Sequence, residues 1–168
     1  MCIRDRGYTA HYDRKEQGTV VDYVVIMGYD EHYAGSAEAG SVASIGYVQQ
    51  GIENTVSAVP QEKVINAVPF YTRLWKWGES LTSEALSMSA AANYLAQYGV
   101  AASWDETTCQ DYATFEADGV TYQIWLEDAE SIAVKLNMMA TKNIGGVAVW
   151  RLGYGTQAAW ELINAYLQ

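Results

Sequence analysis

The 168-residue sequence predicts an α/β fold built on a parallel sheet. Three short apolar segments, at residues 22–28, 63–69 and 147–150, have the composition of parallel strands that are buried on both faces. Helical patterns come after them, and strands that alternate with helices are typical of a parallel sheet with right-handed crossovers. An Asp118-Gly119 pair between two alternating runs adds a β-hairpin.

Three of the predicted helices carry apolar residues three or four positions apart, which places these residues on one face. The first helix, within residues 44–59, ends before Pro60, and the other two begin after the capping residues Asp128 and Thr156. The apolar positions are Val48, Ile52 and Val56 in the first helix, Ile132, Leu136 and Met139 in the second, and Ala159, Leu162, Ile163 and Tyr166 in the last.

A stretch at about residues 74–127 interrupts the alternation of strands and helices, and it predicts a small α+β insertion. A helix over residues 88–98 is expected there, with Gly99 as its C-terminal cap. The hairpin follows, with strands at residues 113–117 and 120–125 joined by the Asp-Gly turn.

Composition and charge exclude several classes of function. The formal net charge of −10 disfavours nucleic-acid binding, because such a surface repels phosphate backbones. Two cysteines and two histidines without ligand spacing predict neither a metal site nor a disulfide framework, and no cofactor is expected. The sequence shows no signal peptide and no apolar run of membrane-spanning length, so we expect no membrane insertion.

Two architectures are compatible with a parallel sheet of this kind. Three strand–helix units are too few to close an eight-stranded barrel on their own. A doubly wound sheet is the alternative, but no strand is followed by a G-x-G-x-x-G loop, so nucleotide binding is disfavoured.

Aromatic, acidic and basic side chains gather where the predicted strands end. Active sites of parallel α/β folds lie at the carboxyl ends of their strands. Aromatic rings stack on the apolar face of a pyranose, while carboxylates and hydroxyls bind its OH groups, so this set predicts a sugar site. The residues are Tyr29, Asp30, Glu31, Tyr71, Arg73, Trp75 and Trp150.

Five segments, in order, resemble glycoside hydrolase family 18, the chitinase-like family. Residues 27–30 (Met-Gly-Tyr-Asp) are similar to its M-x-Y-D motif after barrel strand six, residues 69–73 to the end of strand seven, and residues 145–150 to strand eight. The insertion and the segment opening at Glu127-Asp128 complete the match, which runs from about Tyr8 to the C-terminus. The insertion and the Trp-Arg-Leu-Gly ending most resemble bacterial spore-cortex and cell-wall N-acetylglucosaminidases.

This resemblance implies that the chain is the C-terminal part, about strands 6–8, of a TIM (β/α)₈ barrel. It implies substrate-assisted retaining hydrolysis of β-1,4-linked N-acetylglucosamine in peptidoglycan or chitin. Tyr29 and Asp30 then take the catalytic positions: Tyr29 holds the 2-acetamido group, and Asp30 binds the distorted sugar. The substrate-binding residues are Met27, Glu31, Tyr71, Arg73 and Trp150, with Trp150 as the floor under the sugar.

One family signature is missing. The D-x-x-D-x-D-x-E motif, whose glutamate is the general acid, does not occur in the sequence. We therefore expect that the N-terminal half of the barrel is missing, that residues 1–6 are a non-family leader before a partial barrel at 7–168, and that the chain alone is inactive. The resemblance places the parent protein outside a bacterial cell or in its envelope.

Two other functions remain open at this point. A family member without its acid can act as a lectin-like carbohydrate-binding protein, and the aromatic residues retained here are compatible with that. The chain can also be a fragment of an unrelated α/β barrel with a non-sugar ligand, which requires the motif matches to be coincidental.

Overall fold

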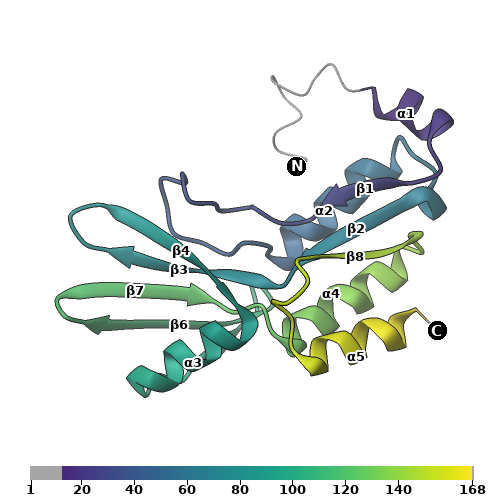
Figure 1. Cartoon of the computed structure of the whole chain (residues 1–168). Coiled ribbons are helices and arrows are strands. Elements are labelled where there is room, and N and C mark those ends of the chain that lie inside the picture. Colours follow the sequence, from purple (N-terminus) through teal and green to yellow (C-terminus); the bar gives the residue numbers. More distant parts are fainter. Residues whose placement is uncertain (1–12, 168) are drawn as a thin grey trace.

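The computed structural model describes residues 13–167, and the leader expected at residues 1–6 lies outside this part. The strands of the described part form two sheets joined end to end (Figure 1). The first sheet is parallel, with the order β1-β2-β8, and contains β1 (Val24–Met27), β2 (Val64–Pro69) and β8 (Gly146–Trp150). The predicted parallel pairing of these three segments is confirmed.

The second sheet is antiparallel, with the order β4-β3-β7-β6-β5. Its strands are β3 (Tyr71–Trp77), β4 (Leu81–Ser87), β5 (Ser103–Asp105), β6 (Gln110–Ala117) and β7 (Val120–Trp125). Only Phe70 separates β2 from β3. The helices are α1 (Arg14–Val20), α2 (Ile45–Val56), α3 (Met88–Tyr98), α4 (Ala129–Thr141) and α5 (Gln157–Tyr166), with a short 3₁₀ helix, η1 (Gln61–Lys63), before β2.

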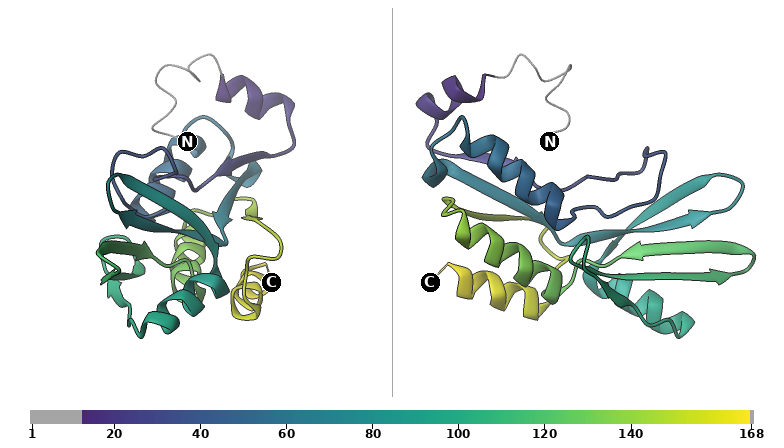
Figure 2. Two further views of the ribbon diagram at one scale, coloured as in Figure 1. Left: turned by 60° about the vertical axis from the view of Figure 1, so that its left-hand side comes forward. Right: turned by 180° about the vertical axis from the view of Figure 1, so that it is seen from behind.

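Three helices, α2, α4 and α5, cover one face of the parallel sheet (Figure 2, right). Ile26, Val64 and Val68 point to this side and are buried against apolar side chains of the helices. The opposite face, the bare face, is open to solvent on the outer strands: Val25 is 55% exposed, Met27 46% and Trp150 54%. The expectation that the first strand is buried on both faces is therefore wrong, because no described element packs on its second face.

Side-chain caps start the main helices where the sequence predicts. The side chains of Ser44 and Thr156 accept hydrogen bonds from backbone N–H groups in the first turns of α2 and α5. Asp128 forms a reciprocal capping box with Ser131 at the start of α4. These bonds satisfy N–H groups that have no partner within the helix, which explains why the helices begin at these residues.

The second sheet packs on α3 through a small core of its own, made by Leu74, Ala91, Leu95, Ala113 and Ile124. Asp118 and Gly119 have φ of 51° and 73°, and positive φ at both central residues is typical of the type I′ turn that an Asp-Gly pair favours. The β3–β4 hairpin was not predicted, since its connection contains no Asn-Gly or Asp-Gly pair.

A buried ion pair lies where the chain returns from the second sheet to α4. Lys135 Nζ is 3.0 Å from Glu127 Oε2, and both side chains are almost wholly inaccessible to solvent. Gln110 Nε2 and Ser131 Oγ donate to the same carboxylate, at 2.8 and 3.1 Å. Ser41 Oγ in turn donates to Gln110 Oε1, so the network joins the β1–α2 loop, β6 and α4. Burial raises the pKa of Glu127, although the charge of Lys135 opposes that shift.

Adjacent glycines before and at the start of β8 provide a matched test of packing. A Cβ atom on Gly145 would lie 2.1 Å from the carbonyl oxygen of Glu62, whereas one on Gly146 would meet nothing closer than 3.9 Å. Gly145→Ala is therefore expected to lower the free energy of unfolding by about 1–3 kcal/mol, the usual cost of overpacking. Gly146→Ala is expected to change it by less than about 0.5 kcal/mol. Urea denaturation of both variants checks this, and equal stabilities would contradict it.

Candidate functional site

A pocket of about 320 Å³ opens where β1, β2 and β8 end and β3 begins. Four residues expected at the site, Asp30, Tyr71, Arg73 and Trp150, line it together. They come from three separate segments, and the expected convergence of strand ends is therefore confirmed as geometry. The remaining lining residues are Ala85, Arg151 and Tyr154.

A short hydrogen bond organises the acidic side of this pocket. Tyr71 donates its hydroxyl to Asp30 Oδ1 over 2.5 Å, and Tyr71 is buried. Burial, together with this bond and the charge of Asp30, raises the pKa of Tyr71. The phenol stays protonated, so it holds the Asp30 carboxylate in one orientation. Asp30 has a φ of 62°, a left-handed conformation that Asp and Asn tolerate better than other side chains.

Tyr29 packs against Tyr71 of this pair. Its ring meets the ring of Tyr71 edge-on, with 6.1 Å between centroids, and the Tyr29 side chain is nearly buried. Burial and then the charge of Asp30 raise the pKa of Tyr29, so its hydroxyl keeps its proton at neutral pH. Tyr29 is not itself part of the pocket lining, but it adjoins the pocket through Tyr71.

The opposite side of the pocket is aromatic and basic. Trp150 is 54% exposed, and its peptide bond to Arg151 is cis. The guanidinium of Arg151 lies 4.2 Å from the centroid of the Tyr154 ring, and its Nη2 donates to the Tyr154 hydroxyl over 2.7 Å. Arg73 donates from Nη1 to Ser83 Oγ over 2.9 Å.

Three residues of the predicted set lie elsewhere. Glu31 accepts a hydrogen bond from the backbone N–H of Ser44 over 2.8 Å, so its carboxylate contacts the start of α2. Met27 lies on the bare face at the end of β1. Trp75 is fully buried, and its indole N–H donates to the carbonyl of Gly40. The substrate-binding roles of Met27 and Glu31 stay predictions.

The sequence did not single out three lining residues. Arg151 and Tyr154 come shortly after the end of β8 in the sequence. This closeness to the carboxyl end of a predicted strand was the signal that could have identified them. Ala85 lies on β4, opposite Arg73 in the sheet register, and it was missed because the β3–β4 hairpin was not predicted.

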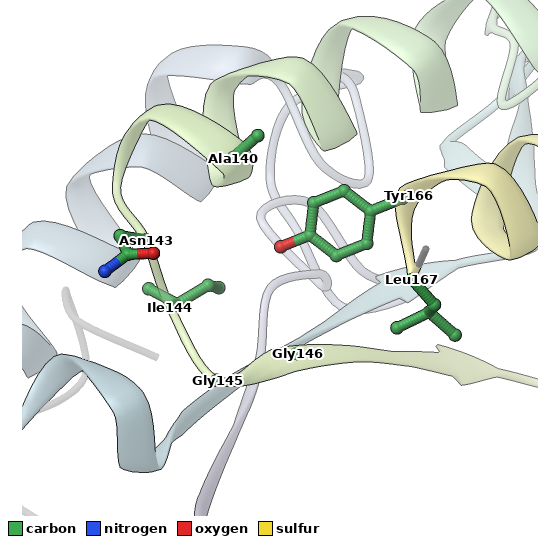
Figure 3. A pocket seen from close by; sticks show the side chains of 7 residues that line it. All are labelled: Ala140, Asn143, Ile144, Gly145, Gly146, Tyr166 and Leu167. Carbon is green, nitrogen blue, oxygen red and sulfur yellow. The ribbon is translucent and has the colours of Figure 1, made fainter.

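A second pocket, of about 350 Å³, lies at the other end of β8 (Figure 3). Gly145 and Gly146 line it together with the Tyr166 ring from α5, but it holds no acidic or basic side chain. In the described part of the chain, no group of three or more His, Cys, Asp or Glu side chains is arranged to hold a metal ion. Among residues 13–167, no helix has both the length and the apolar character needed to cross a membrane.

Comparison with known proteins connects this fold to carbohydrate hydrolases. The chain is 30% identical over 156 residues to a cortical fragment-lytic enzyme of Bacillus anthracis, covering 90% of this chain and 36% of that protein. The spore cortex-lytic enzyme SleL of Bacillus cereus matches with a TM-score of 0.84 and 31% identity, over 92% of this chain and 37% of that one. A chitinase from Chromobacterium violaceum matches with a TM-score of 0.85 and 27% identity, over 98% of this chain and 52% of that one.

The chain therefore spans a little over a third of the first curated relative and about half of the chitinase structure. The family model described as glycosyl hydrolases family 18 matches residues 2–155, which include every lining residue of the first pocket. The α/β fold is that of the chitinase-like structures, and the family resemblance predicted from the motifs is confirmed. The chain belongs to glycosyl hydrolases family 18.

Proposed function

We propose that this chain forms one wall of the active site of a glycosidase that cleaves β-1,4-linked N-acetylglucosamine polymers. The observation that carries the proposal is the pocket in which Asp30, Tyr71 and Trp150 meet. An exposed indole provides a flat apolar surface for a pyranose ring, and a carboxylate held by a phenol provides a fixed polar contact beside it.

In the proposed reaction, the carbonyl oxygen of the sugar's own 2-acetamido group attacks C1 and displaces the leaving oxygen, which takes a proton from the general acid, and an oxazolinium ion forms with inversion at C1. Water then attacks C1 and opens this ion with a second inversion, so the hydrolysis as a whole retains the configuration. Tyr29, which adjoins the pocket through Tyr71, would donate its hydroxyl to the acetamido group and align it for attack. Asp30 has one oxygen held by Tyr71, and its other oxygen accepts a hydrogen bond from the distorted sugar. Holding the nucleophile of the substrate in this geometry supplies the rate enhancement that comes from proximity.

The proposal includes an architecture. The parallel sheet would be strands 6–8 of a (β/α)₈ barrel, and the α+β insertion would be the region around the second sheet. The bare apolar face with Val25, Met27 and Trp150 supports this, since the interior of such a barrel is filled by side chains from all of its strands. The general acid would then belong to the other strands of a longer protein.

The names of the relatives bear on substrate and location. Cortical fragment-lytic and spore cortex-lytic enzymes, by those names, act on spore cortex, which favours peptidoglycan as the polymer. We accordingly propose that the parent protein works in the cell envelope of a bacterium or outside the cell.

Binding of di-N-acetylchitobiose to the purified chain tests the proposal. Trp150→Ala is expected to weaken binding roughly tenfold, because it removes the stacking surface for the sugar. The matched control is Trp77→Ala, since Trp77 is similarly exposed but lies at the far end of β3. Isothermal titration calorimetry measures both. Equal affinities for the two variants would contradict the proposal, and a longer protein that binds without hydrolysing would indicate the lectin-like function instead.

A further inference from the structure

The pocket contains two arginines that are not neutralised by a carboxylate. The sequence has 20 acidic and 10 basic residues, so carboxylates that could pair with an arginine or lysine are in excess. The ion pairs recorded among residues 13–167 use Lys76, Lys135 and Lys142, and Arg73 and Arg151 take part in none of them. Both arginines line the pocket beside Trp150.

Both guanidinium groups are held in place by neutral partners. Ser83 accepts from Arg73, and the Tyr154 ring and hydroxyl hold Arg151. The Nε atom of Arg73 is buried and has no hydrogen-bond partner among the described residues. A buried donor without a partner costs free energy, so the hydrogen-bonding capacity of this arginine is not used up by the described residues.

The only carboxylate in the pocket is already engaged. Asp30 accepts the short hydrogen bond from Tyr71, and it lies outside ion-pair distance of both arginines. Two planar guanidinium groups therefore present unused N–H donors beside the stacking surface. Guanidinium donors match the two oxygens of a carboxylate better than they match a sugar hydroxyl.

We infer that Arg73 and Arg151 form a carboxylate subsite beside Trp150, which selects glycans that carry an acidic substituent over neutral ones. This inference rests on the proposed function and narrows its substrate class. On an N-acetylated polysaccharide, the carboxylate belongs either to a lactyl ether on the sugar or to a peptide attached to that ether. In a chain with a net charge of −10, two local cations also offset the repulsion of an acidic polymer.

Three disaccharides of matched size test the inference on the purified chain by isothermal titration calorimetry. Di-N-acetylchitobiose is neutral, N-acetylglucosaminyl-N-acetylmuramic acid carries a free lactyl carboxylate, and its L-alanyl-D-isoglutamine derivative carries the carboxylate on the peptide. We expect at least one acidic ligand to bind about tenfold more tightly than the neutral one, as charge-assisted hydrogen bonds predict. The preference should shrink when the salt concentration is raised from 0.05 to about 0.5 M, because ions screen exposed charges.

Arg151→Gln is expected to remove most of this preference, because it removes the charge-assisted bonds to the carboxylate. Arg151→Lys keeps the charge but loses the fork of donors, so it should restore the preference only in part. Lys76→Gln is the matched control, since it removes one positive charge from β3 outside the pocket.

The outcomes separate this inference from the proposed function. Binding of di-N-acetylchitobiose that depends on Trp150, with no preference for either acidic ligand, would overturn the subsite and leave the proposed function standing. A preference that Lys76→Gln reduces as much as Arg151→Gln does would also overturn it, because the effect would then be that of net charge. Failure of the chain to bind any of the three ligands would contradict both.

Discussion

Replacing Lys135 with methionine is expected to lower the free energy of unfolding by about 3–5 kcal/mol, the usual cost of breaking a buried ion pair from one side. Glu127 would be left as an unpaired carboxylate in a site closed to solvent, with only Ser131 and Gln110 as donors. Thermal and urea unfolding of the purified chain measure the loss. A change below about 1 kcal/mol would show that the pair contributes little.

The double variant Glu127→Leu with Lys135→Met is the control. Since apolar residues of similar volume often replace a buried ion pair at little cost, the double variant should recover most of the stability. If the double variant is no more stable than Lys135→Met, the loss of stability comes from packing and not from the unpaired charge of Glu127.

The pH dependence of Lys135→Met adds a second measurement. Burial already raises the pKa of Glu127 to about 7 with Lys135 present, and removal of the lysine charge should raise it further. The folded state then binds a proton that the unfolded chain, with a glutamate pKa of about 4.3, has released. The free energy of unfolding of Lys135→Met should therefore lie far below that of the wild type at pH 8 and less far below it at pH 6. An equal deficit at both pH values would contradict this assignment.

Asp30→Asn in the longer parent protein is expected to lower kcat/KM by about 10²–10³-fold, the usual effect of removing one preorganised polar contact from a transition state. In the proposed reaction, the neutral amide would bind the distorted sugar more weakly than the carboxylate. Steady-state hydrolysis of a chromogenic N-acetylglucosaminide measures the effect. Activity within threefold of wild type would rule out a catalytic role for Asp30.

The choice of asparagine separates catalysis from backbone conformation. Asp30 has a φ of 62°, and asparagine adopts this left-handed region readily, whereas alanine pays roughly 1–2 kcal/mol for it. Asp30→Asn should therefore melt close to wild type, while Asp30→Ala should lose both activity and stability. Tyr71→Phe, which removes the phenol that holds the carboxylate, should produce an intermediate loss of activity.

The parts of the fold that depend on neighbouring residues were predictable from the sequence. Gly99 ends α3 with a φ of 63°, Asp118-Gly119 forms its turn, and Asp128 caps α4, as expected. In each case a backbone N–H group or a positive φ is satisfied by a residue only a few positions away, so the pattern is visible in the sequence.

The unpredicted parts depend on contacts between distant segments. The pattern of β3 contains charged residues on both faces, and its pairing with β4 and β7 is not marked by a turn signal. Glu31 follows the M-x-Y-D match directly, yet its carboxylate contacts Ser44, 13 positions further along the chain. Arg151 became a candidate only when the folded chain brought it beside Trp150 and Arg73.

The two crossings between the sheets have a consequence for modularity. The chain leaves the parallel sheet at Phe70 and comes back after Trp125, and these points adjoin, because Thr72 Oγ1 donates to the carbonyl of Trp125. Everything between them is one cassette whose ends already meet. The cassette supplies Tyr71, Arg73 and Ala85 to the pocket, while Asp30, Trp150, Arg151 and Tyr154 come from outside it. Exchange of the cassette between family members would therefore replace one side of the pocket, including the tyrosine that holds Asp30, while Asp30 and Trp150 stay the same.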